Sequence, residues 1–295
     1  MDGNPIQRVR QFNRTVAERI GALHDGFLGR GRPLGESRIL WEIGLGDVEV
    51  RALRARLGVD SGYASRVLRS LSRQGLITLA PAAHDGRVRA VRLTDAGRAE
   101  CAELDRRSDA VAWSFLEPLD GVQRTRLVTA MTEVERLLCA SMVRIEVEDP
   151  TTSEARWCIE QYFAELNARF PSGFDPRHSI SAAAHELVPP YGALLVARLR
   201  GRAVGCGAVK LHADAPAELK RMWVAPEVRG LGLGRRMLRE LEQYAQAAGA
   251  QTVRLETNRT LTEAIRLYRS TGYHDVPAFN DEPYAHHWFE KDLRV

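Results

Sequence analysis

The sequence predicts two domains: a helical N-terminal domain that carries a β-hairpin, and a C-terminal α/β domain. A length of 295 residues corresponds to about two domains of ordinary size. Apolar residues recur at three- and four-residue steps in the first half, whereas short strands alternate with helices in the second half. We place the boundary between residues 141 and 142, where a new strand pattern begins.

Composition indicates a globular protein of the cytoplasm. Hydrophobic residues make up 44% and charged residues 27%, which is enough for a core and a solvated surface. No run approaches the roughly 18 apolar residues of a membrane helix, and the N-terminus lacks the apolar segment of a secretory signal. The four cysteines lie far apart without a Cys-x-x-Cys pair, which disfavours disulfides and metal sites. We expect no metal and no membrane association.

Positive charge is concentrated in one segment. Residues 51–98 hold ten arginines and three acidic residues, a net charge of +7 against +4 for the whole chain. Arginine is common throughout, since only three lysines occur, but the shortage of acids is local. Such a shortage favours a polyanionic partner. A solvated basic helix face is the alternative.

The N-terminal segment predicts two helices. Apolar residues recur at helical steps from Asn4 to Leu28 and predict one helix over that range. A break rich in glycine, arginine and proline follows at 29–35. A second helix is predicted over 36–43.

Two short helices at 49–58 and 60–75 come next. Gly58 suits the left-handed cap that ends a helix, and Asp60 or Ser61 suits an N-cap. Two helices joined by so tight a turn predict a helix-turn-helix.

Residues 76–94 alternate in polarity and turn over at Asp85-Gly86, which predicts a hairpin and completes a winged helix. On the second helix of the pair, Ala64, Val67, Leu68 and Leu71 can pack inward. The opposite side carries hydroxyls and guanidinium groups suited to phosphates and base edges. The candidate DNA contacts on that helix are Ser61, Tyr63, Ser65, Arg66 and Arg69. On the hairpin, Arg87 and Arg89 could reach an adjacent minor groove or backbone.

Residues 57–98 resemble the winged-helix core of MarR-family transcription regulators. They carry the run LGxDxGYxSRxLxxLxxxGL, then Asp85 and Arg87 as the Asp-x-Arg signature of the wing, followed by LTxxG. The similarity extends over about residues 5–140, including a long helical tail. The resemblance implies a homodimer, formed through flanking helices, that binds a palindromic operator in double-stranded DNA.

The second half predicts a mixed α/β domain with three helices. Strands are predicted at 142–148, 192–199, 203–212, 217–224 and 251–257, with further strands toward the C-terminus, and helices at 152–168, 232–248 and 261–270.

The stretch VRGLGLGRR at 228–236 has glycine at every other position: Gly230, Gly232 and Gly234. A Rossmann site fits poorly, because the spacing is off by one and five residues separate the strand from the first glycine, although Glu256 stands about where the ribose acid would. A Walker loop fails because no Lys-Ser/Thr follows. A pyrophosphate cradle of backbone N–H groups at a helix start fits best.

The same residues resemble the strand-loop-helix signature of the GNAT acyltransferase superfamily. Arg229, Gly232 and Gly234 stand at the Arg/Gln-x-x-Gly-x-Gly/Ala positions, and EAIRLYRSTGY at 263–273 resembles the helix beside the thiol end of coenzyme A. The resemblance covers about residues 142–295 and implies acetyl-CoA as cosubstrate, with no metal. The expected acetyl-CoA contacts are Met222, Trp223, Val224, Arg229, Gly230, Leu231, Gly232, Leu233, Gly234, Arg235, Asn258 and Tyr268.

The resemblance also implies acyl transfer to a primary amine. That reaction needs a base for the ammonium, polarisation of the carbonyl and an acid for the leaving thiolate. Tyr268 matches the general-acid tyrosine of the superfamily, and the backbone N–H of Val224 is placed to polarise the acetyl oxygen. Glu218, on the same strand, is our candidate base, directly or through water. A surface acid at a strand edge is the alternative explanation for it.

Several other residues are weaker candidates for a coenzyme contact, an acceptor pocket or a metal site. Many relatives have Asn where this chain has Leu261, and Asn258 is the nearby substitute for that contact. Six residues could line an acceptor pocket, although packing or a surface position explains each more simply: Tyr191, His212, Trp223, Asn280, Tyr284 and His286. The pair His286-His287 does not indicate a metal, since adjacent strand residues point to opposite faces.

Three functional hypotheses follow. The first is a bifunctional protein that acetylates a small-molecule amine and regulates genes. The second is a transcriptional regulator whose GNAT domain only senses acetyl-CoA or another ligand. The third is an enzyme whose helical half serves only for dimerisation.

Overall fold

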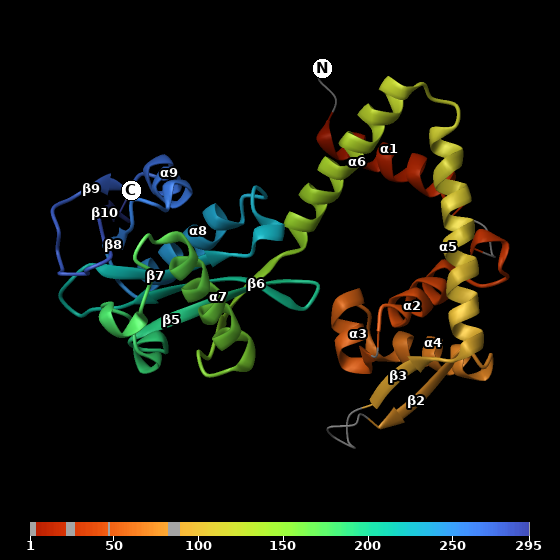
Figure 1. Cartoon of the computed structure of the whole chain (residues 1–295), viewed down its shortest axis with the longest axis horizontal. Helices are drawn as coiled ribbons and strands as arrows, with labels where there is room; N and C mark the ends of the chain where they lie inside the picture. Colours follow the sequence, from red (N-terminus) through yellow and green to blue (C-terminus); the bar gives the residue numbers. More distant parts are fainter. Residues whose placement is uncertain (1–3, 22–26, 47, 82–88, 295) are drawn as a thin grey trace. The chain divides into compact units, whose positions relative to one another are not determined.

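A computed structural model describes residues 4–21, 27–46, 48–81 and 89–294. The chain forms two compact units, residues 1–131 and 132–295, and each is described by itself (Figure 1). The division falls within helix α6 (Gly121–Met142), so the predicted boundary after residue 141 lies near the end of that helix and stays a prediction. Among the described segments, none of the helices combines the length and apolar composition that a bilayer crossing needs.

The first unit consists mainly of helices, as predicted. Besides the first part of α6, they are α1 (Pro5–Arg19), α2 (Leu34–Gly44), α3 (Val50–Leu57), α4 (Ser61–Arg73) and α5 (Asp95–Leu116). The first helix is shorter than the predicted range 4–28. It ends at Arg19 because Gly21 adopts a left-handed φ of 68°, and Phe27–Gly29 forms a separate 3-10 turn.

The helix-turn-helix is confirmed at both predicted caps. Gly58 ends α3 with φ of 64°, and the side chain of Asp60 accepts the Tyr63 N–H at 2.8 Å before α4. The predicted inward face of α4 is buried, and it packs in one core with α2. The other face of α4 therefore remains outside, where a recognition helix needs it.

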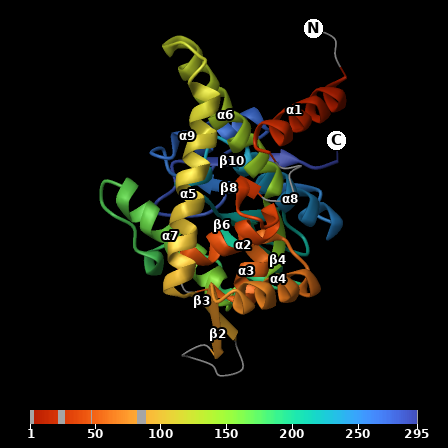
Figure 2. The ribbon, with the colours of Figure 1, turned by 90° about the vertical axis from the view of Figure 1, so that its right-hand side faces the viewer.

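A three-stranded sheet completes the first unit. The predicted hairpin strands are β2 (Ile77–Pro81) and β3 (Arg89–Leu93), which pair antiparallel (Figure 2). The strand β1 (Val48–Glu49) joins the other edge of β3 and is too short to be recognised from its pattern. The turn at Asp85-Gly86 lies outside the described residues.

Among the α-helices of the described ranges, α1 and α6 bury no residue. Large apolar side chains remain exposed along them and near the end of α5, including Ile6, Val9, Phe12, Trp113 and Val122. An exposed apolar surface of this extent is typical of a protein–protein interface.

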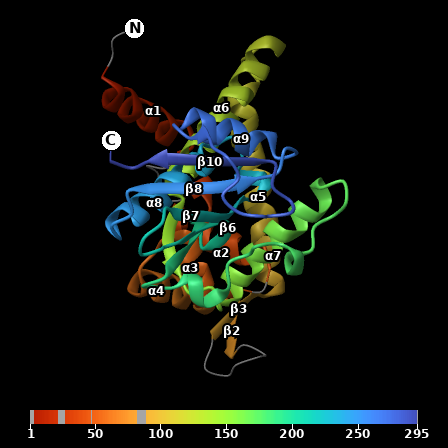
Figure 3. The same cartoon turned by 90° about the vertical axis from the view of Figure 1, so that its left-hand side faces the viewer.

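The second unit is built on a seven-stranded sheet in the order β4-β5-β6-β7-β8-β10-β9. Figure 3 shows its strands β6, β7, β8 and β10 side by side. The strands are β4 (Arg144–Glu148), β5 (Gly192–Leu199), β6 (Arg202–Lys210), β7 (Ala217–Val224), β8 (Thr252–Thr257), β9 (His274–Asp275) and β10 (His287–Asp292). Among the described strands of this sheet, β7 and β8 pair in parallel and the other neighbours pair antiparallel.

Helices α7 (Ser153–Arg169) and α8 (Leu233–Ala247) cover opposite faces of this sheet. A Cβ on Gly207 of β6 would meet Leu241 and Met237 of α8. The thiol of the neighbouring Cys206 interacts electrostatically with that of Cys158 on α7, whose Sγ donates to the Gly205 carbonyl at 3.8 Å, and successive strand residues point to opposite faces. The third predicted helix is α9 (Thr262–Ser270), which follows β8.

The sheet opens where β7 and β8 part. They pair only at Ala217 and Glu218, opposite Val253 and Arg254. Beyond that point, β7 also shifts its register against β6, and Arg221 adopts a left-handed φ of 55°. The separation of two parallel strands leaves a gap in the sheet at their C-terminal ends.

Candidate active site and candidate DNA interface

The glycine loop between β7 and α8 is built to receive an anion. Gly230 and Gly232 adopt φ of 77° and 76°, and Gly232 is the N-cap of α8. A Cβ on Gly232 would meet no atom within 4 Å, so the space in front of the helix is open. No side chain caps the first N–H groups of α8. Such N–H groups, at the positive end of the helix dipole, bind phosphates. The loop therefore fits the pyrophosphate of a coenzyme A thioester.

Two arginines flank the loop. Arg229 donates from Nε to the Val224 carbonyl at 2.9 Å, and its Nη2 lies 2.5 Å from Glu165. Arg235 donates to the Ser270 hydroxyl at 3.0 Å. Both side chains are exposed, which leaves them within reach of an anion at the loop.

A cavity of about 460 Å³ extends from the loop to Tyr268. Ten of the twelve predicted acetyl-CoA contacts line it: Met222, Trp223, Val224, Arg229, Gly230, Gly232, Leu233, Gly234, Arg235 and Tyr268. Leu231 packs against the core instead. Helix α7 also contributes Tyr162, Glu165 and Arg169 to the cavity, and no motif in the sequence predicts this contribution.

Tyr268 lies at the deep end of this cavity and is 7% exposed. Burial raises the pKa of its hydroxyl well above the ordinary value, and the negative charge of Glu256 raises it further. The hydroxyl therefore stays protonated at neutral pH and can donate a proton.

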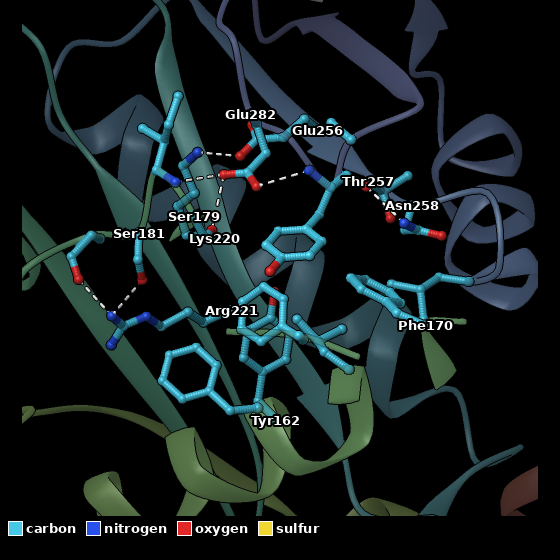
Figure 4. Close-up of a pocket in the computed structure, with 18 residues that line it drawn as sticks. Tyr162, Phe170, Ser179, Ser181, Lys220, Arg221, Glu256, Thr257, Asn258 and Glu282 are labelled. Carbon is cyan, nitrogen blue, oxygen red and sulfur yellow. Dashed lines mark hydrogen bonds and ion pairs between the residues drawn. The ribbon is translucent and has the colours of Figure 1, made fainter. Parts of the chain in front are cut away.

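A second, smaller cavity of about 70 Å³ adjoins the first (Figure 4). The two share Tyr162, Leu166 and Leu261 as lining residues. Glu256, at the end of β8, lines the second cavity with a side chain that is only 9% exposed. One of its oxygens binds Lys220, and the other, Oε2, has no hydrogen-bond partner among the residues that the structure describes. A carboxylate oxygen in this position can accept a proton, or a hydrogen bond from an ammonium group.

Glu218, our candidate base, lies elsewhere. It lines neither of these two cavities. Its carboxylate binds Arg254 at 2.6 Å and lies 3.5 Å from Lys220. Burial opposes the ionisation of Glu218, but the Arg254 hydrogen bond and the Lys220 charge outweigh it and lower the pKa. These ion pairs occupy the carboxylate, so the geometry favours Glu256 in its place.

Asn258 lines the second cavity rather than the first. Its amide donates to the Tyr284 carbonyl at 2.7 Å, and its oxygen accepts the Thr260 N–H at 3.0 Å. The side chain thus connects two loops and is not free for a coenzyme contact. Of the six aromatic, histidine and asparagine candidates for the acceptor pocket, Tyr284 alone lines this cavity.

On the first unit, most of the candidate DNA contacts are exposed. They are Ser61, Ser65, Arg66 and Arg69 on α4 and Arg89 at the start of β3. Tyr63 is half-buried, and its hydroxyl lies so close to Gly35 of α2 that a side chain at Gly35 would have to displace it. It therefore serves packing as well, and Arg66 lies over its ring at 6.0 Å. Arg87 lies outside the described residues.

Comparisons with known proteins find one family match in the N-terminal part of the chain and another in the C-terminal part. The sequence profile of the acetyltransferase (GNAT) family matches residues 159–273, and that of the MarR family matches residues 30–88. An uncharacterised N-acetyltransferase of Schizosaccharomyces pombe is 42% identical over 100 residues, which cover 33% of this chain and 58% of that protein.

Two further relatives are covered over more of their length. An IAA acetyltransferase of Azospirillum brasilense is 35% identical over 48% of this chain and 90% of its own. The N-alpha-acetyltransferase RimI of Mycobacterium tuberculosis is 33% identical over 43% of this chain and 76% of its own. With the glycine loop, the buried tyrosine and the winged helix described above, these matches show that the chain belongs to the acetyltransferase (GNAT) family and carries a MarR-family domain in its N-terminal half.

Proposed function

We propose that this protein is an acetyl-CoA-dependent N-acetyltransferase of a small-molecule amine and, through its first unit, a DNA-binding transcriptional regulator. The proposed enzymatic activity rests on the arrangement of the glycine loop, the larger cavity and Tyr268 in the second unit. An open helix N-terminus borders a cavity that Tyr268 also lines, and the negative charge of Glu256, in the adjoining cavity, helps to keep the Tyr268 hydroxyl protonated. A domain that only sensed a ligand would not need this acid and base.

In the proposed mechanism, the amine enters the second cavity as an ammonium ion, and Glu256 accepts its proton. The neutral nitrogen forms a bond to the thioester carbonyl, whose oxygen is polarised by the N–H of Val224. When the C–S bond breaks, the leaving sulfur takes the proton of Tyr268. The nitrogen loses its second proton as the amide forms, which returns Tyr268 to its protonated form, and Glu256 releases the first proton to solvent. One ammonium ion and one thioester give one amide, one thiol and one released proton.

The direct test is a screen of primary amines for the release of free thiol from acetyl-CoA. Thiol release that depends on both the amine and the enzyme supports the proposal. Tight binding of acetyl-CoA without turnover of any amine would instead favour the ligand-sensing alternative.

We expect Tyr268→Phe to lower kcat about 10-fold or more, because acid catalysis typically contributes 10²–10⁴. The affinity for acetyl-CoA should hardly change, and the loss should shrink where protonation of the leaving thiol is not limiting. Steady-state kinetics and calorimetry measure the two quantities. Tyr273→Phe is the matched control, since that hydroxyl binds Glu242 at 2.9 Å and does not line the cavity. Full activity of Tyr268→Phe would remove the acid role.

The regulatory half is supported by the exposed face of α4 and by the exposed apolar surface of α1, α5 and α6. The first provides hydroxyls and guanidinium groups for a major groove, and the second provides a surface for a homodimer. Two copies would then present two recognition helices to a palindromic site. If the protein is only an enzyme and its helical half serves only for dimerisation, it needs the homodimer surface but not the exposed arginines of α4.

Arginine substitutions separate base contacts from phosphate contacts. Arg66→Ala is expected to cost about 1–3 kcal/mol of affinity for the preferred duplex and to relax sequence preference, because a guanidinium can pair with guanine. Arg89→Ala should weaken all sequences alike and flatten the slope of log affinity against log salt by about 1. Fluorescence anisotropy over a salt series measures both effects.

Arg106→Ala serves as the control, because it removes the same charge from α5, where Arg106 pairs with Glu103. Acetyl transfer measured without DNA should stay at the wild-type rate in all three variants. If no duplex, including the promoter region of its own gene, binds better than random DNA, the enzyme-only alternative holds.

A further inference from the structure

The second cavity contains two buried polar atoms of opposite character that lack a partner. Nε of Arg221 and Oε2 of Glu256 are both enclosed, and neither has a hydrogen-bond partner in the described part of the chain. Both residues line the cavity. Buried polar groups are seldom left unpaired in native proteins, so this donor and this acceptor each indicate a missing partner.

Arg221 is a half-buried cation whose Nε is fully enclosed. Its Nη2 donates to the Ser181 hydroxyl at 3.0 Å and to the Ala182 carbonyl, and its guanidinium lies 5.4 Å from the Phe163 ring centre. Within the described ranges it forms no ion pair with a carboxylate, and burial lowers its pKa. Its left-handed φ of 55° is uncommon for a side chain of this size, and such strain often occurs at functional sites.

The other acid of the cavity is already occupied. Glu282 accepts hydrogen bonds from the Ser179 hydroxyl at 2.9 Å, the Ile180 N–H at 2.6 Å and the Tyr284 N–H at 3.2 Å. Figure 4 shows these bonds above the pocket, with Arg221 and Ser181 on one side and Asn258 and Phe170 on the other. Glu282 joins two loops and leaves Arg221 without a carboxylate.

Aromatic rings form the remaining wall. They come from α7, the loop after it and the loop before β10, and they form a connected set: Tyr162, Phe163, Phe170, Phe174 and Tyr284. The cavity volume of about 70 Å³ is smaller than the ~150 Å³ of a cavity that holds benzene in another protein. A short aliphatic side chain therefore fits this site better than a bulky ring system.

We propose that the amine acceptor is an α-amino acid with a compact aliphatic side chain, whose carboxylate pairs with Arg221 and whose ammonium faces Glu256. This inference rests on the proposed acetyltransferase function. A guanidinium binds a carboxylate by two parallel hydrogen bonds, which fixes the orientation of the substrate as well as its charge. The aromatic wall then receives the side chain, and the amine is directed to the end of the acetyl-CoA cavity.

The test uses the wild-type protein and compares three acceptors that share the same isobutyl group. They are L-leucine, L-leucinamide, which lacks the negative charge, and isoamylamine, which lacks the carboxylate. A paired carboxylate should give L-leucine a kcat/KM about 10- to 100-fold above either analogue. L-Tryptophan should react more slowly than L-leucine because its side chain exceeds the cavity.

The Arg221→Met variant should reduce the ratio of kcat/KM for L-leucine to that for isoamylamine about 10-fold or more. Arg221→Lys should restore part of the ratio, which a merely structural role would not predict. The control Arg177→Met removes an exposed arginine that pairs with Asp175 on the loop after α7 and lies outside the cavity lining. It should keep the wild-type ratio.

Isoamylamine turnover equal to that of L-leucine in the wild-type protein would overturn this proposal and leave the acetyltransferase function intact. An equal loss for both acceptors in Arg221→Met would do the same. Failure of every amine to release thiol, despite acetyl-CoA binding, would overturn the proposed function together with this inference. The comparison of L-leucine with isoamylamine uses only the wild-type protein. It therefore tests the proposed acceptor even if Arg221→Met does not fold.

Discussion

Replacing Gly234 with tryptophan is expected to abolish acetyl-CoA binding while the protein stays folded. Gly234 is the second residue of α8 and lines the larger cavity, and its Cβ position lies 3.4 Å from Leu267 of α9. A large side chain there must enter the space that the pyrophosphate would occupy. Loss of two hydrogen bonds to a charged group amounts to about 3–6 kcal/mol, which is roughly two to four orders of magnitude in affinity. Titration calorimetry measures the loss, and circular dichroism checks the fold.

The matched control is Gly121→Trp. Gly121 also lies at the start of a helix, is exposed, and would place a Cβ with no atom within 4 Å. Because it lies in the first unit, its replacement should leave acetyl-CoA affinity unchanged. Wild-type affinity in Gly234→Trp would contradict the assignment of the glycine loop to the coenzyme, whatever the catalytic residues turn out to be.

The elements and residues that could be predicted are those whose signal is local. The strand end, the glycine loop and the first turn of α8 follow one another in the sequence, so nine of the ten predicted contacts that line the cavity come from the single stretch 222–235. The same holds for α4, where helical periodicity separates the buried face from the exposed one. In both places, the periodicity of regular structure connects sequence position to direction in space.

The acceptor cavity could not be predicted in this way, because distant segments form it. Tyr162 comes from α7, Arg221 from β7, Glu256 from β8 and Tyr284 from a loop near the C-terminus. No spacing in the sequence relates these residues to one another. The left-handed backbone of Arg221 has no sequence signal either, since arginine rarely adopts it.

The choice of base shows the same limit. Glu218 and Glu256 are both strand acids, and the sequence alone does not distinguish their partners. In the sheet, Glu218 stands opposite Arg254 in the parallel register of β7 and β8, and that arginine binds its carboxylate. Glu256 lies two residues beyond Arg254, where the strands have parted, and keeps one oxygen free. Register between strands, which is a long-range property, therefore decides which acid faces the substrate.

Replacing Glu256 with glutamine is accordingly expected to lower kcat/KM at neutral pH about 10²- to 10³-fold. Glutamine keeps the shape of the side chain but cannot accept the proton of the ammonium ion. The loss should shrink toward alkaline pH, where more of the amine arrives without its extra proton, and acetyl-CoA affinity should stay close to the wild-type value. Kinetics across a pH series and calorimetry measure both.

Glu218→Gln is the control that tests the two acids against each other. Each substitution removes one negative charge beside Lys220, so the electrostatic cost around that lysine is similar. Only Glu256→Gln, however, removes the free oxygen at the acceptor cavity. Glu218→Gln should therefore keep kcat/KM within about 10-fold of the wild type and lower mainly the free energy of unfolding, because it breaks a buried ion pair with Arg254. A larger loss of kcat/KM in Glu218→Gln than in Glu256→Gln would return the base role to Glu218.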